Sequence, residues 1–558
     1  MFEPLNPRLP MRTLSIGNIV TASLRLYLLR IKLYFTLALR ACLWLIIPIY
    51  GWAKFFTILG MISRLAFCDL ISQSENIKDS RRFTNSRIVQ FLIVGILANT
   101  LLIIFLAFFI IGYLMVLGLI GFYLQRVSLF IQNSVVLSFS TFLGLIIIFS
   151  MFVVGTNWIY SRLFLSELTL AIDNSFVNSI KSIRKSCKLT KGLPTASRIQ
   201  GIFIIAAIIT LPIWILADII SSIQQWFLNG VLPSNSTLDD RVTGTLDLAI
   251  LLLTFAFIIP FLQTLKAVLY YDLRSRREGF GLQLRIGETF AEENITTPQP
   301  IFNRFILQTP ESVELEFTLG GIGNRIWALV IDYLLLGLIL ILFLIAWAIV
   351  SNQLLNLWTR IFGGNYIGTW LLAIALLIMY AIYTGYFVFF ETLWQGQTPG
   401  KRCAQIRVIR DDGRPIGLFQ ATLRSLLRPF DDIVFLGALL IILNKREKRL
   451  GDWAAGTIVI QVESASAMNL KLSQPSEIVC EKLSTQANLS ELLPDDFVVI
   501  REYLQRRTGM EAEAKRQLGL QLATQVQNAI HLAEIPEELT AEQFLEAVYF
   551  TYQRSSFS

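Results

Sequence analysis

Apolar residues gather in long runs separated by short polar segments over the first 460 residues of the chain. A helix needs about 20 consecutive apolar residues to cross a bilayer. Runs of about that length predict eight transmembrane helices, at residues 33–51, 52–72, within 88–131, 134–160, 200–228, 245–271, 326–350 and 366–391. The run at 88–131 is longer than one span, so we interpret it as one span with an extension or a re-entrant piece. The pattern is typical of an all-α polytopic membrane protein.

Two shorter patterns follow the last predicted span. Residues 405–408 and 457–462 look like strands, and their pairing would form a small cytoplasmic strand pair. The segment between them has an apolar core of only 11 residues, Ile433–Leu443. That length favours an interfacial or re-entrant helix, with a ninth span as the open alternative.

The chain beyond residue 462 is polar and contains two helical stripes. Leu518, Leu522, Val526 and Ile530 repeat every four residues, and a second stripe lies near Phe544. We therefore expect a soluble helical hairpin there. The resulting division is a six-span membrane domain (1–280), a cytoplasmic linker (281–320), a second membrane domain (321–462) and an acidic cytoplasmic tail (463–558).

Composition removes whole classes of function. Of the 558 residues 54% are hydrophobic and only 16% charged, which excludes a soluble enzyme. The one histidine, His531, lies in the polar tail, and the five cysteines form no CxxC pair. His-rich zinc sites and Ser/His/Asp triads within the membrane part are excluded. We expect no enzyme activity, no metal and no cofactor.

Charge indicates topology and partners. Residues 463–558 carry eight basic and fourteen acidic residues, whereas the remainder has a net charge of +14. Basic residues concentrate in loops beside the apolar runs, as retention on the cytoplasmic side requires. We expect both termini in the cytoplasm, no nucleic-acid partner, and a protein partner for the tail. The first 30 residues contain no evident signal peptide, which suits a prokaryotic inner membrane.

Several motifs occur in order within the second membrane domain. They are Gly323–Asp332, Gly396–Arg402, the trio Arg424, Arg428 and Asp431, and Arg449–Thr457. This pattern, over about residues 320–462, resembles the RDD family of membrane proteins, named for one arginine and two aspartates. The resemblance implies that Arg325 and Asp332 are the arginine and the first aspartate. Asp452 and Asp431 are both candidates for the second, and we favour Asp452. It also implies a transport-related role, with cation/proton antiport suggested for some members.

The first block resembles another family more weakly. Residues 179–186, 189–192 and 271–279 are similar to membrane domains found with glycerophosphodiester phosphodiesterases. The catalytic barrel of those enzymes is missing, so the resemblance implies a membrane scaffold without hydrolase activity.

Helical geometry relates the two main motif residues. Arg325 and Asp332 are seven residues apart, which places both on one face of a helix, about 10 Å apart along its axis. Arg325 would lie at the entrance of the span, and Asp332 about two turns deeper. An ionised carboxylate at that depth costs a few kcal/mol, so it needs a partner, a cation or a proton. Such a group could exchange a proton for a cation, or it could hold helices together by hydrogen bonds.

A basic set lies near the end of the second domain. Arg424, Arg428 and Asp431 share one helical face, and Lys445, Arg446 and Arg449 follow. These residues predict either contact with anionic lipid headgroups or a cytoplasmic gate in which arginines pair with Asp431 or Asp452. Gly396–Lys401 has the spacing GxxxGK, and Gly400–Lys401 differs from a phosphate loop by one missing residue and by Arg402 in place of Ser or Thr. The leading hypothesis is an integral transport protein, a monovalent cation/proton antiporter that uses Asp332. The alternative is a non-transporting scaffold or lipid-interacting assembly protein.

Overall fold

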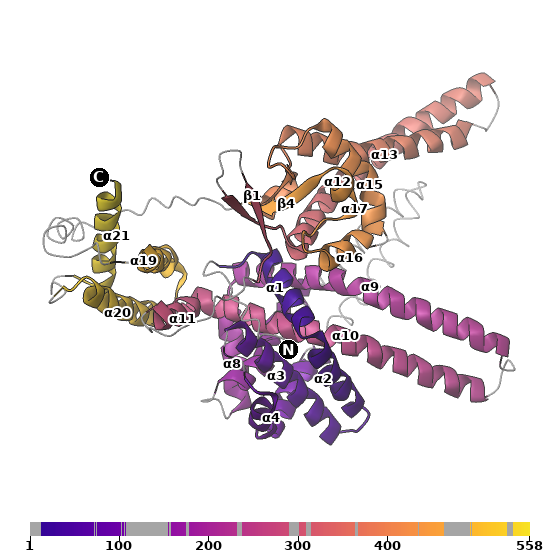
Figure 1. Cartoon of the computed structure of the whole chain (residues 1–558). Coiled ribbons are helices and arrows are strands. Elements are labelled where there is room, and N and C mark those ends of the chain that lie inside the picture. Colours follow the sequence, from indigo (N-terminus) through magenta and orange to yellow (C-terminus); the bar gives the residue numbers. More distant parts are fainter. Residues whose placement is uncertain are drawn as a thin grey trace, which may run out of the picture.

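The computed structural model is mostly helical, with two small strand pairs (Figure 1). It describes residues 13–71, 75–101, 158–173, 178–231, 237–289, 301–308, 314–362, 367–433, 435–462, 494–532 and 539–557, with a few single residues between them. Most of the predicted span at 88–131, nearly all of that at 134–160 and the polar start of the tail lie outside these residues.

The N-terminal block forms one body around helix α10 (Figure 1). Its helices are α1 (Ile16–Leu29), α2 (Ile31–Trp44), α3 (Tyr50–Leu70), α4 (Ile77–Asn85), α7 (Ser166–Ile172), α8 (Ser179–Leu189), α9 (Leu193–Val231), α10 (Thr237–Glu278) and α11 (Phe280–Thr289). Buried apolar side chains of α1, α2, α3 and α10 make its core.

The second block contains the strands and the remaining apolar helices. It comprises β1 (Arg304–Gln308), β2 (Glu314–Thr318), α12 (Ile322–Phe362), α13 (Ile367–Leu393), α14 (Pro399–Cys403), β3 (Ile406–Arg410), α15 (Leu418–Ile433), α16 (Leu436–Leu443), α17 (Leu450–Ala454) and β4 (Thr457–Gln461). Strand β1 pairs with β2, and β3 pairs with β4, both antiparallel. The second pairing confirms the predicted strand pair.

Four helices in the described part are long and apolar enough to cross a membrane. They include Leu193–Leu228, Arg241–Glu278, Ile322–Ile361 and Gly368–Leu393, which correspond to the last four predicted spans. Two helical hairpins, α9–α10 and α12–α13, extend from the body (Figure 1). These helices indicate an integral multi-pass membrane protein.

The prediction of a span at 33–51 is wrong. Helix α2 has 14 residues, or about 21 Å, against a hydrocarbon thickness of about 30 Å. The helix ends at Trp44. Pro48 and the positive φ of 60° at Ile49 then keep the backbone from continuing as a helix until α3 begins. Helix α3 is long enough, but Lys54, Arg64 and Asp69 make it too polar to count among the candidate spans. Both helices pack into the core of the N-terminal block instead.

Helix α16 has eight residues and is too short to span a bilayer. It follows α15, an amphipathic helix whose outward side chains include Leu418, Phe419 and Phe430, all exposed. The length of α16 argues against the ninth span that the sequence left open, and the interfacial or re-entrant placement of this segment stays a prediction.

The tail forms a bundle of α19 (Pro494–Arg506), α20 (Ala512–Ala529) and α21 (Ala541–Phe557), beside α11 (Figure 1). The predicted stripe residues Leu518, Leu522, Val526 and Ile530 are buried in its core. The bundle has one helix more than the predicted hairpin, because α19 contributes Val499, Ile500 and Tyr503 to the same core.

Helix α1 joins the two blocks by packing against the start of α12. The Gly323 amide donates to the Thr21 hydroxyl at 3.0 Å, and the Ser15 hydroxyl bonds the side-chain oxygen of Asn324 at 2.8 Å. A Cβ atom on Gly17 would lie 2.2 Å from the backbone nitrogen of Asn324. Glycine at position 17 is therefore required for this close approach.

We expect Gly17→Ala to push α1 away from α12 and to lower the free energy of unfolding by about 1–3 kcal/mol. Thermal unfolding in detergent measures the effect. Gly337→Ala is the matched control, because a Cβ there meets nothing within 4 Å. Equal melting temperatures for the two variants would contradict this account of the junction.

Candidate functional site

Buried ionisable side chains concentrate where α12 begins and α13 ends. The short elements α14, α15 and α17 pack around the same place. The buried set is Arg325, Asp332, Glu391, Lys401, Arg424, Arg428, Asp431, Arg449 and Asp452. Charged side chains are rarely this deeply buried unless they are paired, so their partners determine what the site can do.

Helix α15 supplies two of the cations because of its amphipathic sequence. Arg424 and Arg428 are one turn apart and lie on the face opposite Phe419 and Phe430. Both guanidinium groups are therefore directed into the protein, where they are 1% and 2% exposed. The Ser425 hydroxyl on the same helix donates to the Thr384 carbonyl at 3.0 Å, which fixes α15 against α13.

Asp452 is the first centre of the charge network. Its carboxylate accepts hydrogen bonds from Arg325 at 2.7 Å, from Arg449 at 3.3 Å and from Arg424. The Arg449 backbone amide adds a fourth at 3.2 Å and completes a capping box at the start of α17. Burial raises the pKa of Asp452, but the three arginines outweigh burial and hold that pKa well below its usual range. Asp452 is therefore ionised.

Glu391, near the end of α13, is the second centre. Lys401 pairs with one carboxylate oxygen, Arg424 donates to the other at 3.2 Å, and Arg428 lies 3.8 Å away. Arg424 therefore connects the two centres. Burial, reinforced by the two arginines and opposed by Glu391, lowers the pKa of Lys401 to about 7. The charge of Lys401, which lies outside the spans, therefore changes near neutral pH.

Asp332 forms a third centre of different character. Its carboxylate accepts from the Thr398 hydroxyl at 2.6 Å, the Gly400 amide at 2.8 Å and the Tyr386 hydroxyl at 3.0 Å. Each of these donors is uncharged. A Cβ atom on Gly400 would lie 2.1 Å from the Ala328 carbonyl oxygen, so glycine allows α14 to approach α12 this closely.

The structure separates two residues that the sequence placed on one face. Arg325 and Asp332 both lie on α12, but Arg325 donates to Asp452 and to the Gly320 carbonyl. Arg325 therefore pairs with Asp452 on another element. Asp431 instead accepts from the backbone amides of Leu450 and Gly451, both at 3.1 Å, and so positions the start of α17.

The predicted basic set divides into buried and exposed members. Arg424, Arg428 and Arg449 are at most 7% exposed and face protein carboxylates, whereas Lys445 and Arg446 are exposed. Contact with lipid headgroups is thus open to Lys445 and Arg446. The described residues contain no group of three or more His, Cys, Asp or Glu side chains suited to a metal.

Sequence reasoning missed several residues of the site. Glu391 was treated only as the end of a span, and Thr398 and Tyr386 were not singled out. An acidic residue that ends an apolar run is the signal that could have identified Glu391. In the N-terminal block, Lys266 had no predicted partner, and the structure pairs it with buried Glu167 at 2.5 Å.

Comparison with known proteins places the site within one family domain. The RDD family matches residues 319–456, which include the whole charge network. No curated protein and no solved structure matches the chain. None of these comparisons supports the similarity of the first block to phosphodiesterase-associated membrane domains. The chain is therefore a multi-pass membrane protein with an RDD family domain at residues 319–456.

Proposed function

We propose that the protein is a membrane transporter that exchanges protons for monovalent cations through its RDD domain, with Asp332 as the exchanging group. The surroundings of Asp332 carry this proposal. Its side chain is buried within a candidate span, and its three hydrogen-bond donors are uncharged. None of these three donors is a guanidinium or ammonium group, so none of them supplies the counter-charge that a buried carboxylate needs.

The atoms around Asp332 suit a hard cation. The Thr398 hydroxyl oxygen lies 2.6 Å from one carboxylate oxygen of Asp332, and the Tyr386 hydroxyl oxygen lies 3.0 Å from the other. Oxygen ligands of this kind are preferred by hard cations. Entry of a cation would require the hydroxyl groups to turn their protons away and their lone pairs inward.

The adjacent charge network supports a gate at the end of the spans. Ion pairs centred on Glu391 and Asp452 connect α12, α13, α14, α15 and α17. A buried ion-pair network of this size contributes little net stability compared with apolar packing. We therefore assign the network a role other than stability. It would form a gate that is closed while these ion pairs are intact and opens when the charged groups exchange partners.

The hydrogen bonds of Asp332 favour a second candidate function. A carboxylate with one donor from α13 and two from the N-cap and start of α14 is also a good structural connector between helices. In that case the protein is a non-transporting membrane scaffold or a lipid-interacting assembly protein.

Flux measurements separate the two functions. The full chain is reconstituted in proteoliposomes with a trapped pH dye, and Na⁺, K⁺ or Li⁺ is added outside. If the protein exchanges protons for cations, at least one of the three cations should enter while protons leave. The internal pH should then rise. The absence of any cation-driven pH change with all three would contradict transport and favour the scaffold.

The pKa of Lys401 predicts the pH dependence of this exchange. Below pH about 7 Lys401 is protonated and paired with Glu391, and above it the ammonium charge is lost. We expect the wild-type exchange rate to rise as the pH increases through about 7, because the ion pair between Lys401 and Glu391 is then lost and the gate opens more easily. Lys401→Arg stays protonated at all these pH values, so its rate should stay low and flat between pH 6 and 8. A rise of equal size in both proteins would show that Lys401 is not the titrating group.

A further inference from the structure

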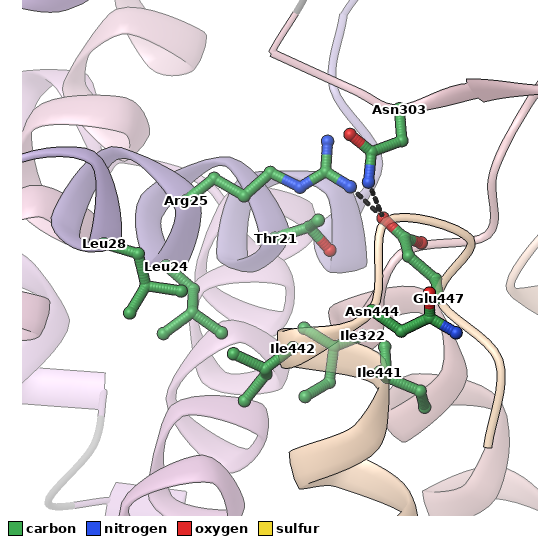
Figure 2. A pocket seen from close by; sticks show the side chains of 10 residues that line it. All are labelled: Thr21, Leu24, Arg25, Leu28, Asn303, Ile322, Ile441, Ile442, Asn444 and Glu447. Carbon is green, nitrogen blue, oxygen red and sulfur yellow. Dashed lines mark hydrogen bonds and ion pairs between the residues drawn. The ribbon is translucent and has the colours of Figure 1, made fainter. Parts of the chain in front are cut away.

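A cavity of about 50 Å³ lies between the N-terminal block and the RDD domain (Figure 2). One wall is apolar and is made by Leu24 and Leu28 of α1 together with Ile441 and Ile442 of α16. The edge of this wall reaches the outside of the protein, since Leu28 is 37% exposed. It is distinct from the charge network around Asp452 and Glu391.

The other end of the cavity is polar. Arg25, Asn303, Asn444 and Glu447 line it, and Figure 2 shows Arg25 and Asn303 meeting the same carboxylate oxygen of Glu447. The Glu447 side chain is 3% exposed. Its second oxygen, Oε2, is buried and has no hydrogen-bond partner in the described part of the chain. A buried carboxylate oxygen without a donor is costly, so this end of the cavity favours a donor-bearing cation.

The position of the cavity fits the boundary between lipid tails and headgroups. Helix α16 exposes Leu439 and Leu443, at 56% and 74%, as a lipid-facing helix would. The chain then turns polar at once with Asn444, Lys445 and Arg446, of which the last two are exposed. This order of exposed residues suits acyl chains along the apolar wall and phosphate groups at the polar end.

Size and charge together select the ligand. A volume of 50 Å³ holds about three or four water-sized groups, enough for an ammonium group on a two-carbon arm. A primary ammonium supplies N–H donors for Glu447, whereas the trimethylammonium group of choline supplies none and is bulkier. Lys445 and Arg446 are exposed and come between Asn444 and Glu447 in the chain, so they are the basic residues that could take the phosphate.

We propose that this cavity binds the headgroup of an ethanolamine phospholipid, with its ammonium group at Glu447 and its acyl chains along α1 and α16. The site joins the two blocks of the protein through one lipid. The inference is independent of the proposed exchange at Asp332, which uses none of these residues.

Native mass spectrometry of the delipidated full chain tests the site. Equal amounts of phosphatidylethanolamine and phosphatidylcholine with identical acyl chains are added, and the bound ratio is measured. We expect a preference for the ethanolamine lipid of about tenfold, the size of one charge-assisted hydrogen bond. Glu447→Gln should bring the ratio close to one, whereas Glu316→Gln, at an exposed strand position, should keep it.

Glu447 also forms an ion pair with Arg25, so Glu447→Gln could act through that pair. A second variant therefore tests the cavity without changing Glu447. Ile442→Trp fills the cavity without changing a charge and should lower retention of the ethanolamine lipid at least as strongly. Equal retention of both lipids by the wild type, or an unchanged preference in both variants, would overturn the site. Competition by phosphoethanolamine without acyl chains at equal concentration would show that the apolar wall contributes nothing and would overturn the lipid assignment.

Discussion

Asp452→Asn is expected to lower the free energy of unfolding of the RDD domain by about 3–5 kcal/mol. The substitution keeps the size of the side chain and removes the one carboxylate that Arg325, Arg424 and Arg449 share. The three buried guanidinium groups would then lose the carboxylate that they share, and Arg325 would have no acidic partner left among the described residues, whereas Glu391 would still face Arg424. Thermal unfolding in detergent should show a melting temperature lower by roughly 10 °C or more.

Asp412→Asn is the control for this prediction. It makes the same chemical change in the turn after β3, where the side chain is 52% exposed. We expect a change within about 0.5 kcal/mol there. If Asp452→Asn melts within 2 or 3 °C of Asp412→Asn, Asp452 does not hold the three arginines together.

Glu391→Gln should have an effect of similar size, about 3–5 kcal/mol, for the same electrostatic reason. Lys401, Arg424 and Arg428 all face this one buried carboxylate. Because Lys401 is the closest of them, removing its charge as well should restore part of the loss. The double variant Glu391→Gln with Lys401→Met should therefore be more stable than Glu391→Gln alone.

A double-mutant cycle on the melting temperature measures this coupling. The two single variants and the double variant are compared in the same detergent and at pH 6, where Lys401 is protonated. Strict additivity of the two single effects would contradict a direct interaction between Glu391 and Lys401.

The pattern of apolar and polar residues predicted those helices and strands that depend mainly on residues close together in the chain. The last four spans are apolar over their whole length, and the strand pair β3–β4 is bounded by a turn at residues 411–413 with Gly413 at φ 82°. In contrast, the predicted span at 33–51 does not form, because the helix is interrupted before Pro48 and Ile49 although the run is apolar. Hydropathy alone does not register such a break.

The candidate site was predicted only in part because its pairing is long-range. Helical spacing correctly placed Arg325 and Asp332 on one helix. Their partners, Asp452 and Thr398, come from 127 and 66 residues along the chain, and the spacing of residues on one helix carries no information about them. Glu391 was overlooked for the same reason, since its importance depends on three cations from other elements.

Proton flux in wild-type and Asp332→Asn proteoliposomes tests the central claim most directly. Asparagine has the shape of aspartate but cannot take a proton or balance a cation, and Asp412→Asn serves as the matched control. The account predicts cation-driven pH change in the wild type and in the control, and its loss in an Asp332→Asn protein that elutes and melts as a folded protein. Undiminished exchange in folded Asp332→Asn would contradict the assignment of Asp332 as the exchanging group.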